Sequence, residues 1–167
     1  MDERIVGFPP VCGSDAKLLI LGSMPSVASL QQSFYYAHPR NIFWPMLAEI
    51  LGEEAPLHVE EKKAMLLRHR IALWDTAHSC VREGSLDSSI RQAQANDFDG
   101  LFESCPQIDC ILFNGGTAQR LYLRLVSKND GKRHRLLPST SPAYTMEYSK
   151  KLELWKQALK EGLNESL

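Results

Sequence analysis

The chain has 167 residues, of which 44% are hydrophobic and 23% charged, and 19 basic against 20 acidic side chains give a formal net charge of −1. This composition excludes intrinsic disorder, collagen-like structure and a coiled coil as the main architecture, and it suits one domain with a substantial core. Because phosphate contacts dominate non-specific affinity for nucleic acid, a near-neutral chain can bind DNA only through a local basic surface.

The sequence lacks the features of an exported or membrane protein. No apolar run approaches the roughly 18–20 residues that cross a bilayer, and the first four residues do not follow a signal-peptide pattern. The cysteines are scattered and form no Cys-x-x-Cys pair. We therefore expect free thiols in a reducing cytoplasm.

Four short apolar runs predict buried strands at residues 18–21, 71–74, 110–113 and 135–137. Helical spacing of apolar residues predicts helices at 43–51, 98–102, 118–126 and 152–159, with Gly52 ending the first and Pro106 following the second. Residues 1–16 are expected to form a loosely structured lead-in. The order of elements predicts the α/β class: a single three-layer α/β/α domain over residues 1–167, with a mainly parallel sheet of about four strands.

The segments after these strands are small, polar and rich in glycine or proline: 22–26, 75–79, 114–117 and 138–142. In a parallel sheet they emerge together at the carboxyl edge, where ligands bind. The basic run 132–135 precedes the last strand, so it is expected to be a solvated loop at the opposite edge.

Three common kinds of site have weak support. The five histidines show no metal-ligand spacing, so no metal and no cofactor is predicted. Asp75 and His78 with Ser139 or Ser141 would compose a hydrolase triad, yet no Gly-x-Ser-x-Gly motif presents a nucleophile. Gly115-Gly116 opens a helix without a dinucleotide or P-loop motif.

The aromatic patch at residues 34–44 is the strongest local signal. Three consecutive aromatic residues precede Arg40 and Asn41 on a segment that reads as a loop. Aromatic faces beside polar side chains favour a flat heterocycle, which stacks on a ring and is hydrogen-bonded at its edge. Phe43 and Trp44 belong to the following helix and are expected to pack in the core.

At these residues the chain resembles a known family. Gly22-Ser23-Met24-Pro25-Ser26, followed by Ala37-His38-Pro39-Arg40-Asn41-Ile42-Phe43-Trp44, is similar to the uracil-DNA glycosylase superfamily, and within it to the hypoxanthine-DNA (deoxyinosine) glycosylase branch. Segments 137–143 and 80–87 resemble two further motifs of that branch. In the related G:T/U mismatch branch an asparagine that positions water stands where this chain has Met24, which cannot polarise water.

The resemblance implies a monofunctional DNA glycosylase of base excision repair. Such an enzyme flips a deaminated base, hypoxanthine in preference, out of the DNA and hydrolyses its N-glycosidic bond. The implied partner is DNA containing that base, and we expect a monomer in the cytoplasm at the nucleoid. The resemblance implies that Asn41 takes the key catalytic role. Ser23 and Asp75 are further catalytic candidates because they follow strands at the carboxyl edge, although Asp75 could equally cap the turn after its strand. Those expected to contact the base are Tyr36, His38, Asn114 and Met24. Those expected to contact DNA are Arg40, Ser139, Thr140, Ser141, Pro142 and Tyr144.

Two other functions stay open from the sequence. One is a uracil or G:T/U mismatch-specific glycosylase with a different catalytic residue. The other is a module that binds damaged DNA or a free nucleobase without catalysis, which the methionine at position 24 would favour.

Overall fold

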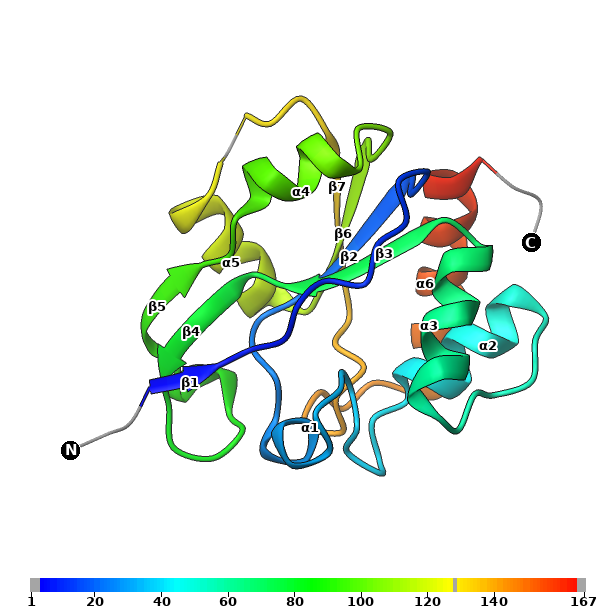
Figure 1. Cartoon of the computed structure of the whole chain (residues 1–167). Coiled ribbons are helices and arrows are strands. Elements are labelled where there is room, and N and C mark those ends of the chain that lie inside the picture. The colour runs from blue at the N-terminus through cyan, green and yellow to red at the C-terminus, as the bar shows by residue number, and fades with distance from the viewer. Residues whose placement is uncertain (1–3, 128, 165–167) are drawn as a thin grey trace.

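The computed structural model describes residues 4–127 and 129–164. At its centre is a four-stranded parallel sheet in the order β3 (Ile71–Asp75), β2 (Leu18–Gly22), β6 (Cys110–Asn114) and β7 (Arg133–Leu137). Every residue of β2, β3 and β6 is buried, because helices cover both faces of the sheet (Figure 1). The four predicted strands and the three-layer α/β class are confirmed.

The helices divide between the two faces. Helices α4 (Phe98–Ser104) and α5 (Gly116–Leu125) lie on one face, and α2 (Phe43–Leu51), α3 (Val59–Arg68) and α6 (Tyr148–Leu163) on the other (Figure 1). The short helix α1 (Val27–Gln32) follows β2 beyond the carboxyl edge. Four of these helices match the predicted ones, whereas α1 and α3 were not predicted. Helix α2 ends as expected at Gly52, whose φ of 71° is left-handed.

A second, antiparallel sheet corrects two predictions. It consists of β1 (Arg4–Val6), β4 (Ala77–Val81) and β5 (Arg91–Ala95) in the order β1-β4-β5. Within residues 1–16, the described part contains β1 and a bridge from Val11 to Leu73, and is otherwise irregular. Residues 75–79 are not a loop. Only Thr76 separates β3 from β4, and β5 is largely polar, so neither strand stands out as an apolar run.

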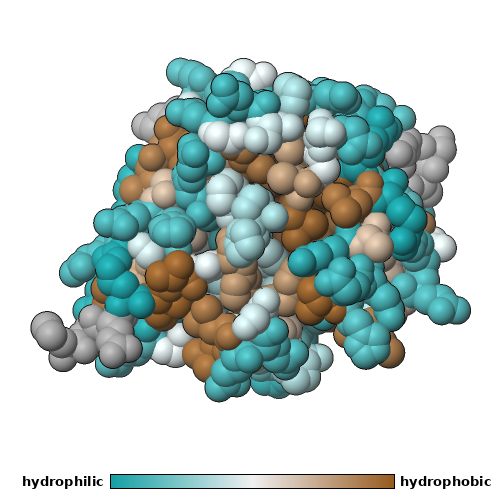
Figure 2. All heavy atoms as spheres, in the orientation of Figure 1, coloured by the Kyte–Doolittle hydropathy of each residue, from teal (hydrophilic) through white to brown (hydrophobic). Residues whose placement is uncertain are grey.

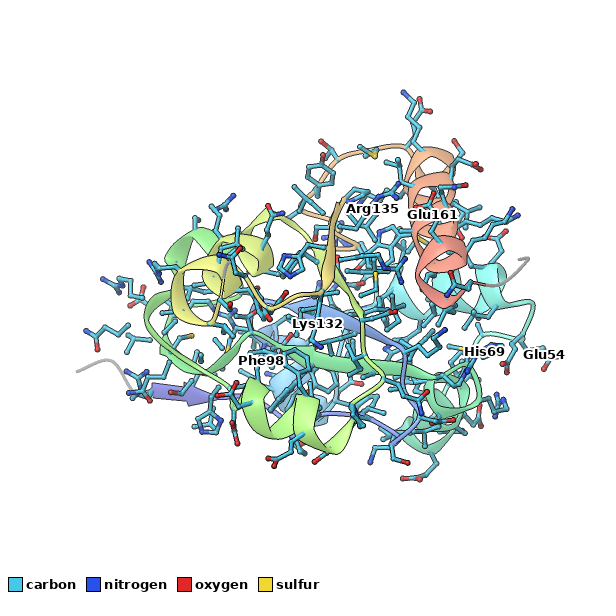
Figure 3. All side chains as sticks on the ribbon, turned by 90° about the horizontal axis from the view of Figure 1, so that it is seen from above. Glu54, His69, Phe98, Lys132, Arg135 and Glu161 are labelled. Carbon is cyan, nitrogen blue, oxygen red and sulfur yellow. The ribbon has the colours of Figure 1, made fainter. Side chains whose placement is uncertain are left out.

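The basic run 132–135 lies at the amino edge, as predicted, but it is not a solvated loop. Arg133 begins β7 and pairs in register with Cys110, the first residue of β6. Figure 3 looks onto this edge and shows Arg135 and Glu161 pointing toward one another, 2.6 Å apart at the charged groups. Arg133 likewise pairs with Asp109 at 3.1 Å, and Lys132 Nζ donates to the Ile108 carbonyl at 2.7 Å. These cations are paired within the fold.

None of the helices in the described part of the chain is long and apolar enough to span a membrane. All four cysteines are free thiols. On the face seen in Figure 2, hydrophobic residues gather in small groups between hydrophilic ones rather than in one broad patch.

Candidate active site at the carboxyl edge

The end of β2 brings Tyr36 and Asp75 together over Gly22. A Cβ atom on Gly22 would lie 2.4 Å from Asp75 Oδ1 and 2.8 Å from the Tyr36 hydroxyl. Tyr36 reaches this place from a left-handed backbone with φ of 54°, and its ring packs on Phe43 with 4.2 Å between centroids. Only glycine leaves room for the two polar groups at this position.

Buried polar atoms without a hydrogen-bond partner concentrate here. Within residues 4–127 and 129–164 they are the Tyr36 hydroxyl, Asp75 Oδ2, and Nε and Nη1 of Arg82. The other terminal nitrogen of Arg82 donates to the Pro25 carbonyl, so all three residues surround the segment that follows β2. Such atoms are rare in native structures, and they mark a place prepared for a water or a ligand.

The charges around Asp75 set its protonation. Burial and, to a smaller extent, the Asp87 carboxylate raise the pKa of Asp75 to about 7, against an opposing effect of Arg82. Burial and then the charge of Asp75 raise the pKa of the Tyr36 hydroxyl, which therefore stays protonated. The Asn114 side chain favours the ionised form of that hydroxyl in a geometry that falls short of a hydrogen bond. Asp75 is thus a carboxyl group that titrates near neutrality.

Asn41 lies two residues before the start of α2 and keeps one end of its side chain for a ligand. Its Oδ1 accepts a hydrogen bond from the Phe43 N–H at 3.0 Å. Its Nδ2 has no partner among the described residues, and the side chain is partly exposed. The arrangement leaves a hydrogen-bond donor for a ligand and assigns the acceptor to the helix start.

Asn114 and Thr140 form a framework behind the site. Asn114 Nδ2 donates to Thr140 Oγ1 at 3.0 Å, and its Oδ1 accepts from the Thr140 N–H at 2.9 Å. The Thr140 carbonyl in turn accepts from the Ile42 N–H, next to Asn41. Thr140 is 1% exposed, so its hydroxyl is committed to Asn114 rather than offered to a phosphate.

Three further predicted residues occupy the surrounding loops. Ser23 Oγ donates to Asp87 Oδ1 at 2.7 Å and so fixes the turn before β5. The Met24 side chain is buried in a small apolar cluster with Ala77 and Cys80. His38 Nδ1 accepts from the Arg40 N–H at 3.1 Å, which leaves Nε2 of this half-buried ring for a ligand.

A cavity of about 520 Å³ adjoins this site on the side of the segment between β7 and α6. Its lining includes five residues predicted to contact DNA: Arg40, Thr140, Ser141, Pro142 and Tyr144. Ser139 is not among them; its hydroxyl accepts from the Ser141 N–H at 3.1 Å and shapes the local turn. Lys151 also lines the cavity; its Nζ lies 5.4 Å from the centroid of the Tyr144 ring and donates to the Tyr144 carbonyl at 2.7 Å.

The structure gives little support to a hydrolase triad, a dinucleotide site or a metal site. His78 is exposed on β4, and no hydrogen bond among the described residues joins it to Asp75. Gly115, with φ of 97°, approaches Ser139 so closely that a Cβ would lie 3.2 Å from that of the serine, which accounts for the glycine by packing. In residues 4–127 and 129–164, no three His, Cys, Asp or Glu side chains gather to hold a metal ion.

Sequence reasoning missed Arg82 and Asp87 as members of the site. Both fall in segment 80–87, which the resemblance had marked without giving its residues a role. An arginine and an aspartate in a polar stretch are usually surface residues. Only the folded chain shows that Arg82 is 6% exposed and that Asp87 contacts Ser23.

Comparisons with known proteins point to one superfamily. A family model described as the uracil DNA glycosylase superfamily matches residues 9–164. A curated protein named hypoxanthine DNA glycosylase from Methanosarcina acetivorans is 41% identical over 138 residues, which are 82% of this chain and 86% of that protein. One of the same name from Methanosarcina barkeri is 32% identical over 155 residues, 92% of this chain and 97% of that protein. The solution structure of a protein from Methanosarcina acetivorans, provisionally named a uracil DNA glycosylase, has 35% identity and a TM-score of 0.83, and covers 96% of this chain and 99% of its own.

Proposed function

The chain belongs to the uracil DNA glycosylase superfamily, and we propose that it is a monofunctional DNA glycosylase that releases hypoxanthine from DNA. It hydrolyses the N-glycosidic bond of deoxyinosine and leaves an abasic site for base excision repair. The relatives named hypoxanthine DNA glycosylase support this substrate. The observation that carries the proposal is a single loop on which Asn41 keeps a spare amide donor and Tyr36 reaches the buried Asp75 over Gly22.

The base reaches this site by leaving the duplex. A base inside the helix is inaccessible, so the nucleotide rotates into a pocket, at a cost of a few kcal/mol that falls when pairing is weak. The hypoxanthine ring lies against Tyr36, which is partly exposed although its hydroxyl is buried. Phe43 supports the Tyr36 ring from the protein side, which holds it in place for stacking.

Asn41 acts on the leaving base. As the glycosidic bond breaks, the sugar gains oxocarbenium character and the base gains negative charge. The Nδ2 group of Asn41 donates to an acceptor on the base edge, and this hydrogen bond strengthens as the charge develops. The contact between Asn41 Oδ1 and Phe43 fixes the amide before the substrate arrives. His38 Nε2 offers a second contact to the base.

Asp75 acts on the side of the water. In its ionised form its unpartnered Oδ2 accepts a hydrogen bond from the attacking water and balances the positive charge of the sugar. Ser23 and Asn114 serve by fixing the loops around it rather than by touching the base, because their side-chain groups are engaged by Asp87 and Thr140.

The absence of a nucleophilic lysine from these motifs supports a simple hydrolysis. A lyase reaction needs an amine that forms a Schiff base with the sugar. Lys151, which lines the adjoining cavity, donates its Nζ to backbone carbonyls of Tyr144 and Ser141. Strand cleavage therefore requires a separate treatment after base release.

The DNA strand runs over the neighbouring cavity. Arg40 supplies positive charge, and Ser141 and Pro142 approach phosphates of the damaged strand, while Ser139 holds the turn that carries them. Tyr144, 47% exposed, fills space next to the vacated position. We also propose that the enzyme works as a monomer on chromosomal DNA in the cytoplasm.

The test is base release from defined duplexes. Duplexes carrying one deoxyinosine, one deoxyuridine or neither are incubated with the protein and then heated in alkali, which cuts the strand at abasic sites. We expect scission at deoxyinosine and much less at deoxyuridine. Scission at deoxyuridine alone would assign the protein to the uracil or mismatch branch. Binding to the inosine duplex without release at stoichiometric protein would identify a binding module instead.

A further inference from the structure

Arg82 is a permanent cation buried beside the site. Only 6% of the residue is exposed, and it directly follows β4. One terminal nitrogen donates to the Pro25 carbonyl, whereas Nε and Nη1 have no hydrogen-bond partner within residues 4–127 and 129–164. A guanidinium group does not lose its proton in proteins, and burying a charge is costly unless an opposite charge compensates it. The fold therefore has to place a negative group near Arg82.

Asp75 is the negative group that the interior offers. It is 3% exposed, and its Oδ2 is a buried acceptor without a partner. Of the unpartnered buried atoms in the described residues, Oδ2 alone belongs to a group that carries negative charge near neutral pH. Because neither Oδ2 nor the two Arg82 nitrogens have a partner, the two side chains attract one another across a gap rather than through a hydrogen bond.

The backbone holds these two charges at opposite ends of one short segment. Gly22, the last residue of β2, pairs in register with Asp75, and its carbonyl accepts from the Thr76 N–H at 2.8 Å. Three residues later, the Pro25 carbonyl accepts from the Arg82 side chain. The loop after β2 is thus tied to the carboxylate at its start and to the guanidinium at its end.

Asp75 lies among groups of opposing effect. Those that face it come from the aromatic loop, the end of β4 and the following turn: Tyr35, Tyr36, Arg82 and Asp87. Burial raises the pKa of both tyrosine hydroxyls, so they stay neutral. Burial and then the Asp87 carboxylate raise the pKa of Asp75, while Arg82 lowers it. Asp87 is exposed and Arg82 is buried, so water screens the charge of Asp87 more than that of Arg82.

We propose that Arg82 is a positioning residue of the reaction, whose buried positive charge holds Asp75 in the ionised form that accepts the attacking water. The inference rests on the proposed function, in which Asp75 acts on the side of the water. Arg82 does not touch the base, because its two unpartnered nitrogens are closed to solvent. Asp87 opposes it by favouring the protonated form of Asp75. The balance of these two charges sets the pH at which the enzyme becomes active.

Removing either charge should move the pH profile in opposite directions. Single-turnover release of hypoxanthine from a deoxyinosine duplex is measured from about pH 5 to about pH 9. We expect Arg82→Met to raise the pH of the half-maximal rate by about one unit, which lowers the rate at neutral pH about fivefold. Asp87→Asn keeps an acceptor for Ser23 Oγ and should lower that pH. Arg82→Lys keeps the charge and should stay near the wild-type midpoint.

Matched controls separate the charge of Arg82 from its structural contact. Arg82→Gln removes the charge but keeps an amide donor for the Pro25 carbonyl, and it should shift the midpoint as Arg82→Met does. Arg120→Met and Glu83→Gln remove charges of each sign at exposed positions and should leave the midpoint unchanged. A uniform loss of rate at every pH, with the midpoint of both neutral Arg82 variants unmoved, would overturn the proposal and leave Arg82 a structural residue.

A second readout does not depend on turnover. The side-chain carboxyl carbons of ¹³C-labelled aspartate are titrated by NMR in the protein without DNA, and the Asp75 signal is identified by its loss in Asp75→Asn. Its midpoint should rise in Arg82→Met and Arg82→Gln and fall in Asp87→Asn. Equal midpoints in the wild type and the two Arg82 variants would also overturn the proposal. If the wild type releases no hypoxanthine at all, the proposed function fails, and this titration still decides whether Arg82 controls the ionisation of Asp75.

Discussion

The Asn114 carboxamide is bonded at both ends to a single residue, Thr140. Nδ2 donates to the threonine hydroxyl at 3.0 Å, and Oδ1 accepts from the threonine N–H at 2.9 Å. The pair joins the end of β6 to the segment after β7, which lines the cavity proposed to carry DNA. The two hydrogen bonds thereby fix the relative position of two loops that are distant in the sequence.

We expect Thr140→Val to destabilise the protein by about 1–3 kcal/mol, because it leaves the buried Asn114 Nδ2 without an acceptor while keeping the volume of the side chain. Base release should fall as the neighbouring loops shift. Urea unfolding followed by circular dichroism measures the first effect. Thr145→Val, at an exposed position of the same segment, is the control. Identical unfolding of the two variants would show that the Asn114 contact contributes nothing.

Replacing Asn41 separates its structural from its chemical role. Asn41→Asp keeps an acceptor for the Phe43 N–H but replaces the donor with a negative charge facing the departing base. We expect its stability to stay near that of the wild type while base release falls on the order of 100-fold. Asn41→Ala should lose the same activity and also about 1 kcal/mol of stability, because the Phe43 N–H loses its acceptor. Wild-type rates in Asn41→Asp would remove Asn41 from the mechanism.

The pH dependence should follow Asp75. Because its pKa in the folded protein is about 7, the ionised form that holds water is lost as the pH falls through neutrality. The rate of base release should therefore be half-maximal near pH 7 and level off more than one pH unit above it. Asp75→Asn should be slow and lack this rise. Single-turnover rates are measured across pH with the wild type and Asp75→Asn, at protein concentrations that saturate the DNA substrate.

The same carboxyl group has an opposite effect on stability. A pKa raised on folding means that the folded chain binds the proton more tightly, so its contribution is complete below the unfolded pKa of about 4 and is lost as the pH rises through about 7. Asp75→Asn should thus stabilise the protein by about 1–3 kcal/mol at pH 8 and have little effect at pH 5. Thermal unfolding at both values measures the difference. A larger gain at the lower pH would contradict the assignment.

Tyr36 should act through its ring. Its hydroxyl is buried without a partner, so Tyr36→Phe should leave stability unchanged or raise it, and base release should persist. Tyr36→Ala should lower kcat/KM by the equivalent of roughly 1–3 kcal/mol, the usual contribution of stacking between a base and an aromatic ring. Steady-state rates at low substrate measure both. If the Phe variant is as impaired as the Ala variant, the hydroxyl carries the function.

Gly22 should tolerate no side chain. In Gly22→Ala the new methyl group would lie 2.4 Å from Asp75 Oδ1 and 2.8 Å from the Tyr36 hydroxyl, so both groups would be displaced. We expect base release to be lost together with part of the stability. Gly7→Ala is a suitable control, because its Cβ would meet its nearest neighbours at an ordinary 3.6 Å. Activity is assayed on the inosine duplex.

The regular parts of the fold could be predicted because their signals are local. The runs at β2, β3 and β6 are apolar throughout, and the spacing in α2 follows one helical face up to Gly52. Strand β5 could not be predicted, since its alternating polar residues resemble a loop until β4 is beside it. The basic run 132–135 was misread for a similar reason: its partners, such as Glu161, lie far away in the sequence.

The sequence by itself determined the family, the parallel sheet and the position of the aromatic loop, because strand periodicity and compact motifs are properties of neighbouring residues. Only the tertiary structure decided which atoms are available to a ligand. In the folded chain the hydroxyl of Ser23 and the carboxamide of Asn114 are already hydrogen-bonded to other residues. Asp75 and Arg82 keep atoms without a partner, and Asn41 keeps a free amide donor. Burial and hydrogen-bond pairing depend on residues brought together from separate strands, and no local pattern contains them.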